Sequence, residues 1–317
     1  MKVKKVIQHY KFVIKSPLVV PRLIQGIVLT KLGKTRLRSI ELGATEACQC
    51  KCPFCYAKDV STTGGKRLTL EEIKSVWKQC RDLGVIHANL TGGDPLLRPD
   101  ICEVIKALNP KSTIVSLVTN GVALNREMIY NLKKAGLNTI QISLDSMDKE
   151  THDAGRGVKG CWDKIMEGAA IAKEAGLVVC ISSILSHEKK SFNEFNRIFD
   201  FCKEKGYFLL INRFGNVGGS KDSADELLTK NEFEQIKAYL NYPFVRQDNM
   251  LNYSLKMECP AGREKIYITF DGEVMPCCMI QKSYGNVRQH SIKELLNNMR
   301  KDYNESVDCY RYKDSKN

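Results

Sequence analysis

The chain has 317 residues, of which 43% are hydrophobic and 27% are charged, and its formal net charge is +13. This length exceeds the usual size of one domain, so we expect a large domain and a smaller one. No run of about 18 apolar residues occurs, which excludes a membrane-spanning helix. Thirteen cysteines without a recognisable secretory leader favour a reducing, cytoplasmic compartment, where thiols serve as ligands and not as crosslinks.

The positive charge is concentrated at the start of the chain. Residues 1–40 contain ten Lys and Arg and no Asp or Glu, so they carry +10 of the net +13. Pro17 and Pro21 divide residues 1–37 into short amphipathic pieces, the second spanning roughly residues 22–32. One interpretation is a pair of helices that cap the main domain with a solvated basic face. The other is a patch, peripheral at the membrane, that meets anionic lipid, or one that meets a phosphorylated or otherwise acidic substrate. Nucleic acid is an unlikely partner, because aromatic residues are not interleaved with the cations.

Beyond Arg38, short apolar runs alternate with longer helical patterns. Strands are expected at 39–43, 88–91, 113–118, 139–144, 178–185 and 208–213. Helices are expected between them at 69–83, 99–108, 126–135, 161–175 and 191–205, with capping boxes at Thr69/Glu72 and Ser191/Glu194. This alternation predicts an α/β fold with a parallel sheet of six units, fewer than the eight of a full barrel. In parallel barrels the chemistry lies at the carboxyl ends of the strands.

A cysteine-rich loop follows the first expected strand. Cys48, Cys52 and Cys55 have the spacing C-x3-C-x2-C, and Phe54 precedes the last of them. Three thiolates on one loop can hold one metal centre, but they cannot complete the four-cysteine ligand set of an ordinary iron–sulfur cluster. One iron is then open to a ligand that is not protein. Structural zinc and merely buried thiols are the alternatives, whereas a disulfide framework is disfavoured in a chain of this length.

The spacing resembles the signature of the radical S-adenosylmethionine (radical SAM) superfamily. In that family a reduced [4Fe-4S] cluster cleaves SAM into methionine and a 5'-deoxyadenosyl radical, which abstracts hydrogen from the substrate. The resemblance implies that Cys48, Cys52 and Cys55 hold the SAM-binding cluster and that the six units form the family's partial (β/α)6 TIM-type barrel. It also implies an oxidoreductase- or transferase-type enzyme that receives electrons from a donor such as flavodoxin or ferredoxin.

The turns after the next three expected strands resemble the family's cofactor-binding motifs. Gly-Gly-Asp after the second strand is similar to the GGE motif that binds the SAM amino group, and its glycines let backbone approach a ligand closely. Thr-Asn-Gly after the third strand resembles the family's TNG turn, and a serine near the end of the fourth occupies the place of one that contacts SAM. The expected cofactor-binding residues are Phe54, Gly92, Gly93, Asp94, Thr119, Asn120 and Ser143.

Three further residues are candidates for contact with the substrate. Arg156 lies in a stretch that resembles the molybdenum-cofactor and peptide-modifying branch; it contacts substrate or the SAM carboxylate in one interpretation and is a solvated loop residue in the other. Cys180 alternates with Ser182 in an expected strand, so both could face the barrel interior. A core cysteine and a hydrogen-atom donor are the alternatives for Cys180, and Cys50 and Cys278 are further candidates for such a donor.

A second group of cysteines lies near the end of the chain. Asp271-Gly272 is a strong hairpin turn between two strand-like segments, and it is expected to bring Cys259 and Cys277 near one another. The spacing Cys-x12-Gly-x4-Cys resembles the opening half of the SPASM/Twitch extension of radical SAM enzymes, which holds auxiliary [4Fe-4S] clusters.

A shortened, Twitch-like version with one auxiliary cluster fits this group. The expected ligands are Cys259, Cys277 and Cys309. Neighbouring residues in a strand project to opposite faces, so Cys278 joins them only if the chain bends there; otherwise the cluster keeps an open iron. A zinc site built from the same thiols is the alternative.

These patterns predict a radical SAM enzyme in three parts. Residues 1–37 form the basic segment, 38–240 the partial barrel, and 241–317 a linker and a small β-hairpin/helix domain that binds the auxiliary cluster. The substrate is expected to be a peptide, a carbohydrate or another small molecule, or a lipid-linked anionic molecule. A two-cluster electron-transfer protein without catalysis, and a zinc-binding structural or nucleic-acid-binding protein, are the alternative functions.

Overall fold

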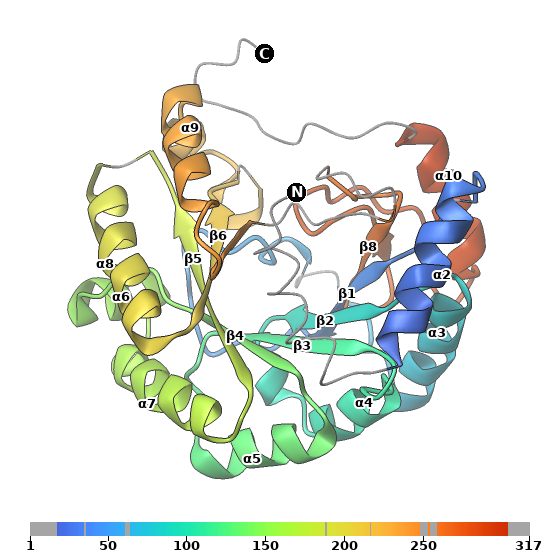
Figure 1. Ribbon diagram of the computed structural model, residues 1–317, viewed down its shortest axis with the longest axis horizontal. Coiled ribbons are helices and arrows are strands. Elements are labelled where there is room, and N and C mark those ends of the chain that lie inside the picture. The colour runs from blue at the N-terminus through green and yellow to red at the C-terminus, as the bar shows by residue number, and fades with distance from the viewer. Residues whose placement is uncertain are drawn as a thin grey trace.

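The protein is built on one curved sheet, seen in the computed structural model (Figure 1). Its strands are β1 (Ser39–Thr45), β2 (His87–Gly92), β3 (Ile114–Thr119), β4 (Thr139–Ser143), β5 (Val178–Leu185), β6 (Phe208–Arg213), β7 (Val245–Gln247), β8 (Lys265–Ile268) and β9 (Val274–Met275). The strand order is β7-β6-β5-β4-β3-β2-β1-β8-β9, and each neighbouring pair is parallel except β8 with β9. The structure describes residues 18–34, 36–60, 64–187, 189–215, 217–247, 253 and 259–303.

Helices surround this sheet. They are α2 (Val19–Lys31), α3 (Leu70–Asp82), α4 (Ile101–Ala107), α5 (Arg126–Ala135), α6 (Lys149–Arg156), α7 (Cys161–Glu174), α8 (Lys189–Lys205), α9 (Lys230–Tyr239) and α10 (Ile292–Asp302), with short 3-10 helices η2 (Pro95–Leu97), η3 (Gly218–Ser220) and η4 (Ala224–Glu226). Helices α3, α4, α5, α7 and α8 follow one another around the outside of the sheet (Figure 1). The predicted α/β partial barrel is therefore confirmed. Within the described ranges, none of the helices combines the length and apolar character that crossing a membrane requires.

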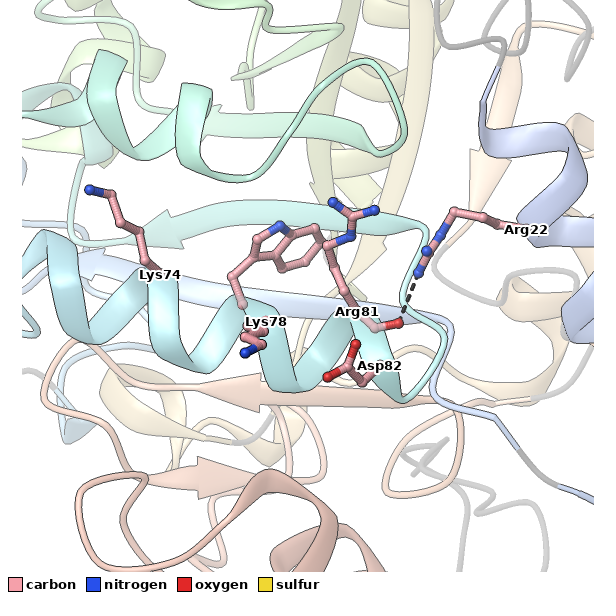
Figure 2. Close-up of a pocket in the computed structure, with 6 residues that line it drawn as sticks. Arg22, Lys74, Lys78, Arg81 and Asp82 are labelled. Carbon is pink, nitrogen blue, oxygen red and sulfur yellow. Dashed lines mark hydrogen bonds between the residues drawn. The ribbon is translucent and has the colours of Figure 1, made fainter.

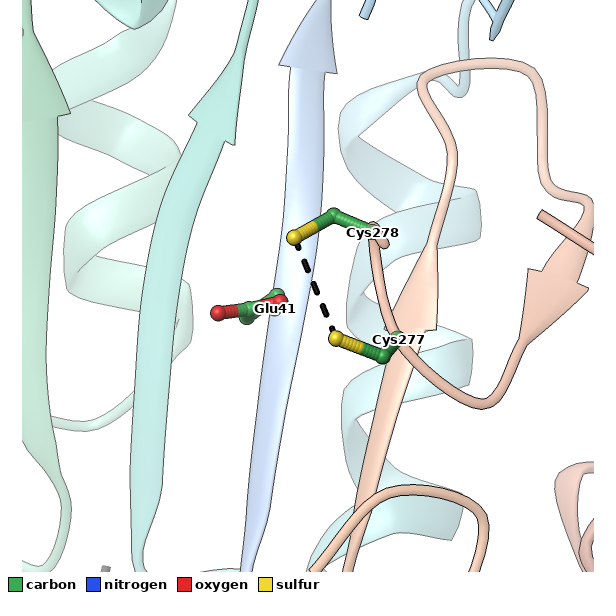
Figure 3. Close-up of side chains that lie close together, drawn as sticks. All are labelled: Glu41, Cys277 and Cys278. Carbon is green, nitrogen blue, oxygen red and sulfur yellow. Dashed lines mark hydrogen bonds between the residues drawn. The ribbon is translucent and has the colours of Figure 1, made fainter. Parts of the chain in front are cut away.

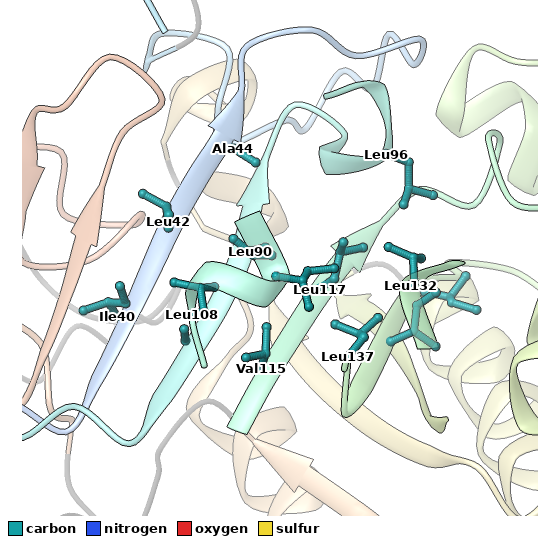
Figure 4. Packing of buried hydrophobic residues seen from close by; sticks show 14 of the residues in the cluster. Ile40, Leu42, Ala44, Leu90, Leu96, Leu108, Val115, Leu117, Leu132 and Leu137 are labelled. Carbon is teal, nitrogen blue, oxygen red and sulfur yellow. The ribbon is translucent and has the colours of Figure 1, made fainter. Parts of the chain in front are cut away.

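The two faces of the sheet differ in chemistry. Alternate strand residues such as Ile40, Leu90 and Leu117 are fully or almost fully buried in the main core beneath the helices (Figure 4). Several of the residues between them face the barrel interior and are polar: Asn89 accepts a hydrogen bond from Gln141 across β2–β4 (3.5 Å). Parallel strands are usually apolar on both faces. The polar inner face therefore marks the barrel interior as the place for ligands.

The predicted elements are present, with ends that shift by a few residues. Helix α8 begins at Lys189, so the predicted capping box at Ser191 is wrong. Glu194 instead accepts hydrogen bonds from Ser146 Oγ (2.7 Å) and Met147 N (2.9 Å), because it lies against the loop that follows β4. Helix α6 and strand β7 were not predicted. By contrast, the capping box at Thr69 is confirmed, with both reciprocal hydrogen bonds formed.

Helix α2 is the described part of the basic segment. It begins at Val19, before Pro21, because a proline in the first helical turn gives up an N–H that has no partner within the helix. Val19 is buried with Ile86 and Tyr253. Ile86 immediately precedes β2, so α2 caps the amino-terminal end of the barrel, as one of the two interpretations expected. Residues 1–17, which also belong to that interpretation, lie outside the described residues.

Arg22 fastens α2 to the barrel. Its Nη2 atom donates to the carbonyls of Arg81 (2.9 Å) and Val85 (3.2 Å) at the end of α3. A surface hollow beside this contact is lined by Lys74, Lys78 and Arg81 as well as Arg22 (Figure 2). The cationic face thus continues from α2 onto α3, at the end of the barrel away from the cysteine loop.

The C-terminal hairpin extends the barrel sheet. Strand β8 pairs in parallel with β1, with Glu41 opposite Tyr267, and Ile266 and Leu295 belong to the same buried core as the barrel strands. The division at residue 240 stays a prediction, but the third part shares its sheet and its core with the second. The hairpin is consequently held against β1, the strand that leads into the cysteine loop.

Candidate functional site

The cysteine loop lies at the carboxyl end of β1, where neighbouring loops hold it. Gly93 N donates to Thr45 O (2.8 Å), Asp94 N to Ala47 O (2.7 Å) and Gly219 N to Cys55 O (2.9 Å). Backbone from the ends of β2 and β6 therefore fixes the start and the finish of the loop. This places the loop at the strand ends where barrel enzymes carry their chemistry.

Hydrogen-bond donors surround two of the three predicted cluster ligands. Cys48 Sγ accepts from Cys50 N (3.4 Å) and Asn120 Nδ2 (3.5 Å), and Cys52 Sγ accepts from Arg156 Nη1 (3.7 Å). Hydrogen bonding by Cys50 lowers the pKa of Cys48 to about 7. Hydrogen bonding by Cys50 and the charge of Arg156 lower the pKa of Cys52 to about 6. Burial raises the pKa of Cys55.

The sulfurs form a donor set suited to iron. Thiolates are the soft ligands that iron–sulfur clusters require, and N–H donors and a guanidinium stabilise the thiolate form. Cys50, a candidate hydrogen-atom donor, lies among them. It forms hydrogen bonds with Cys161, Cys48 and Cys52, and these bonds raise its pKa. Cys161 is also 3.7 Å from His152 Nε2, and nothing in its sequence context indicated that it would lie beside the loop.

The two glycines at the end of β2 are required by the protein backbone packed against them. A Cβ on Gly92 would lie 2.4 Å from Thr45 O, and one on Gly93 would lie 2.1 Å from Ala47 O. The structure thus gives a further reason for these glycines, and their close approach to a ligand stays a prediction. They let the β2 loop pack directly on the start of the cysteine loop.

Asp94 is fully buried and its carboxylate binds protein groups. Oδ1 accepts from Leu96 N (2.9 Å), and Oδ2 accepts from Thr119 Oγ1 (2.8 Å) and Asn120 N (3.1 Å). Burial raises the pKa of Asp94 to about 6. The carboxylate thus joins the turn after β2 to the turn after β3, which sequence reasoning did not foresee.

The remaining predicted cofactor and substrate residues lie around the same opening. Ser143, at the end of β4, is partly exposed and pairs in register with Ser182. Arg156 is buried: it forms an ion pair with Asp145 (2.6 Å) and its guanidinium lies 5.4 Å from the centre of the Phe54 ring. The interpretation of Arg156 as a solvated loop residue is wrong, because α6 carries it inward to the cysteine loop.

Cys180 lies on the inner face of β5. Its neighbour on that face, Ser182, accepts a hydrogen bond from Asn212 Nδ2 (2.6 Å). Burial raises the pKa of Cys180 to about 12, so its thiol stays protonated. A hydrogen-atom donor needs an S–H group, and this role stays a prediction.

The second group of cysteines meets the barrel at β1. Strand β9 ends at Met275, and the chain turns at residues 277–280, where Ile280 N donates to Cys277 O (3.1 Å). The chain therefore bends, and the sulfurs of Cys277 and Cys278 lie 4.0 Å apart on one side. Cys259 is partly buried in the segment that leads to β8. Cys309 lies outside the described residues.

Sequence reasoning missed Glu41, which completes this group. One carboxylate oxygen of Glu41 and the sulfurs of Cys277 and Cys278 all lie within 4.8 Å of one another (Figure 3). Lys265 Nζ binds the Oε1 atom of Glu41 at 2.9 Å. A single acidic residue inside the otherwise apolar run of β1 was the available signal, but its partner cysteines lie in a segment far along the chain.

The fold and site together define an iron–sulfur enzyme of the partial-barrel class. The family model for the radical SAM superfamily matches residues 43–202, and the model for an iron–sulfur cluster-binding domain, SPASM, matches residues 259–316. The chain belongs to the radical SAM superfamily. It is therefore an enzyme whose cofactors are [4Fe-4S] clusters and SAM, so the alternatives of a zinc protein and of an electron carrier without catalysis are set aside.

Relatives with known assignments differ in what they act on. The chain is 28% identical over 275 residues to a probable GTP 3',8-cyclase of Methanocella arvoryzae, covering 82% of this chain and 87% of that protein. It is 25% identical over 268 residues to the PqqA peptide cyclase of Rhizobium meliloti, covering 79% and 71%. The fold is similar to that of Streptococcus suis SuiB bound to its precursor peptide SuiA, with a TM-score of 0.69 and 17% identity; the match covers 84% of this chain and 66% of SuiB, just under two thirds.

Proposed function

We propose that Cys48, Cys52 and Cys55 hold the cluster at which this enzyme cleaves SAM. The observation that carries the proposal is the convergence of donors on Cys48 and Cys52, because groups that stabilise thiolates prepare these sulfurs to bind iron. When bound, the cluster and SAM supply a 5'-deoxyadenosyl radical that takes a hydrogen atom from the substrate. The barrel contributes orientation and excludes water.

The SAM-binding surface is proposed to comprise the turns after β2, β3 and β4. Gly93 and Asn120 lie beside the cysteine loop, and Ser143 is partly exposed at the neighbouring strand end. Asp94 is buried, so we propose that it acts by holding the Gly93 and Asn120 turns together. Phe54, within the loop, and Arg156, on α6, lie against each other.

Anaerobic reconstitution tests this assignment. The protein, reduced with dithionite and supplied with SAM, should form 5'-deoxyadenosine, and the variant with Cys48, Cys52 and Cys55 all changed to Ala should form none. A Cys102→Ala variant is the matched control, because Cys102 packs partly buried on α4, among the helices that cover the outside of the barrel. Equal 5'-deoxyadenosine formation by the triple variant would overturn the assignment.

We further propose that Cys259, Cys277, Cys278 and Cys309 surround an auxiliary cluster. The bend at residues 277–280 supports a role for Cys278, because it turns two adjacent sulfurs to one side. Flavodoxin or ferredoxin is proposed as the electron donor. The auxiliary cluster would accept an electron from the substrate radical or hold the substrate.

A peptide is the substrate class that we propose. Its support is the similarity to a peptide cyclase, with a fold shared with an enzyme bound to its precursor peptide. The test compares 5'-deoxyadenosine formation after addition of a pooled tryptic peptide mixture, GTP or UDP-glucose. Stimulation by the peptides alone is expected; stimulation by GTP alone would favour the nucleotide chemistry of the other relative.

For helix α2 we propose peripheral contact with an anionic membrane. Ile24, Val28 and Leu32 are 55%, 49% and 69% exposed and follow one another at intervals of four residues, so they form one outward row. Exposed Lys31 and Lys34 adjoin this row. An apolar row beside cations is typical of helices that lie in the membrane interface. Because α2 caps the far end of the barrel, a charged substrate in the site would not reach it.

A further inference from the structure

Glu41 is a charged side chain on the inner face of β1, beside the proposed auxiliary cluster. Its side chain is 15% exposed. Lys265 holds Oε1, whereas Oε2 is buried and has no hydrogen-bond partner among the described residues. A buried carboxylate oxygen without a partner loses its solvation without compensation. This atom therefore requires a partner that the described protein groups around it do not supply.

The sulfurs of Cys277 and Cys278 are the neighbours of that carboxylate. All three ligand atoms lie within 4.8 Å of one another, and Figure 3 shows the side chains of Cys277 and Cys278 extending from their turn toward β1, where Glu41 lies. The pairing of β1 with β8 and of β8 with β9 sets this arrangement. The carboxylate is thus placed by the sheet itself, and not by a surface loop.

The chemistry of the three atoms fits a metal centre. Lys265 contacts the Glu41 carboxylate through Oε1, which leaves the other carboxylate oxygen beside the two cysteine sulfurs. Carboxylate oxygen and cysteine sulfur are both ligands that iron accepts.

We propose that Glu41 Oε2 is the oxygen ligand of one iron of the auxiliary cluster, and that its other three irons bind cysteine sulfurs, those of Cys277 and Cys278 among them. One of the four surrounding cysteines is then not a ligand. Lys265 orients the carboxylate through Oε1, as outer groups orient metal ligands elsewhere. This inference rests on the proposed auxiliary cluster. It makes the first barrel strand part of both cluster sites, since β1 carries Glu41 and leads directly into the loop of Cys48, Cys52 and Cys55.

The test uses the full chain with Cys48, Cys52 and Cys55 changed to Ala, so that only the auxiliary cluster is loaded. About four iron and four sulfide ions per protein molecule would establish that cluster. No bound iron would refute the auxiliary cluster, and this inference with it. In that background, Glu41→Gln should shift the g values of the reduced cluster in electron paramagnetic resonance. Glu273→Gln is the matched control, because that carboxylate lies on the same hairpin and accepts from Asn286 Nδ2 (2.9 Å).

Two further measurements separate ligation from a structural role. Lys265→Met removes the ion pair but leaves the ligand, so its g values should stay close to those of the background, whereas a structural pair predicts equal shifts in both variants. Glu41→Ala should regain the background spectrum when acetate is added. An unchanged spectrum in Glu41→Gln, or equal shifts in the Glu41 and Lys265 variants, would overturn the proposal. If Glu41→Gln does not fold, the ⁵⁷Fe Mössbauer spectrum of the background decides: one iron site distinct from three is expected, and four equivalent irons would overturn the proposal.

Discussion

The Nη1 atom of Arg156 lies 3.7 Å from the sulfur of Cys52, at the point where α6 meets the cysteine loop. The same guanidinium forms an ion pair with Asp145 at 2.6 Å, and both side chains are largely buried. A residue in this position acts on the cluster site in two ways: it stabilises a thiolate, and it neutralises a buried carboxylate.

The variant Arg156→Met should lose both effects. Removing one partner of a buried ion pair costs about 3–5 kcal/mol of stability, and the Cys52 thiolate loses its guanidinium. We expect a lower melting temperature and reduced iron incorporation. The double variant with Asp145→Asn should recover most of the melting temperature but not the iron content. Recovery of both would show that Arg156 acts on stability alone.

Thr119→Val tests whether Asp94 acts through the loops. The hydroxyl of Thr119 donates to Asp94 Oδ2 (2.8 Å), and a lost hydrogen bond of this kind costs about 0.5–1.5 kcal/mol. We expect SAM to bind roughly 2–10-fold more weakly, measured by equilibrium dialysis. Ser116→Ala in the same strand is the control, since its hydroxyl pairs with His87 (3.0 Å) near the other end. Unaltered SAM affinity in Thr119→Val would count against a positioning role.

Asp94 also predicts a dependence on pH. Burial raises the pKa of this carboxyl to about 6, above its ordinary value of 3.8. The folded state therefore holds the proton more tightly than the unfolded state, and this contribution to stability is complete below pH 3.8 and is lost as the pH rises through 6. Asp94→Asn cannot ionise, so the difference in melting temperature between it and the parent should change between about pH 4 and 6. A constant difference over that range would contradict the raised pKa.

The membrane proposal for α2 is tested with vesicles containing phosphatidylglycerol. The fraction of protein that sediments with the vesicles should be about tenfold lower for the triple variant Ile24→Ser, Val28→Ser and Leu32→Ser, because its helix no longer has apolar side chains to insert into the membrane interface. Binding of the parent should also fall as salt rises. Leu97→Ser with Tyr130→Ser and Tyr242→Ser is the matched control, since these are exposed apolar residues elsewhere. Equal sedimentation of parent and α2 variant would refute the contact.

Arg288 ties the C-terminal segment to α3. It binds Glu72 Oε1 (2.6 Å) and the carbonyls of Asp271 (2.9 Å) and Lys66 (3.0 Å). We expect Arg288→Ala to lower the free energy of unfolding by about 1–2 kcal/mol, because these partly exposed contacts are screened by solvent. Lys74→Ala, which breaks an exposed ion pair on the same helix, should change it by less than about 0.5 kcal/mol.

The Arg288 effect should depend on pH in a defined direction. Hydrogen bonds from Arg288 and from the Thr69 backbone lower the pKa of Glu72 to about 2, below its ordinary 4.5. Its contribution is therefore complete above pH 4.5 and is lost as the pH falls toward 2. The difference in melting temperature between parent and Arg288→Ala should stay constant from pH 7 to 5 and shrink below pH 4. A difference that persists at low pH would contradict this assignment.

The amino-acid sequence by itself determined the class of the protein and the position of its cysteine loop. Cys48, Cys52 and Cys55 are close in sequence and follow a strand, so their spacing and their place at the carboxyl end of that strand are local properties. The helix beginning at Thr69 was likewise predictable, because a capping box is encoded within four residues. The capping box predicted at Ser191 has the same local pattern but is not formed, because Glu194 binds the loop after β4 instead.

Only the tertiary structure decided which distant groups share a site. Glu41 meets Cys277 and Cys278 because β8 pairs with β1, and Arg156 reaches Cys52 because α6 turns inward beside the cysteine loop. Asp94 is a buried link between two turns, which its sequence context did not indicate, and its contact with SAM stays a prediction. The physical reason is common to all three. Strand pairing and burial join segments with no local signature of one another, and they determine which polar atoms are left to bind a ligand.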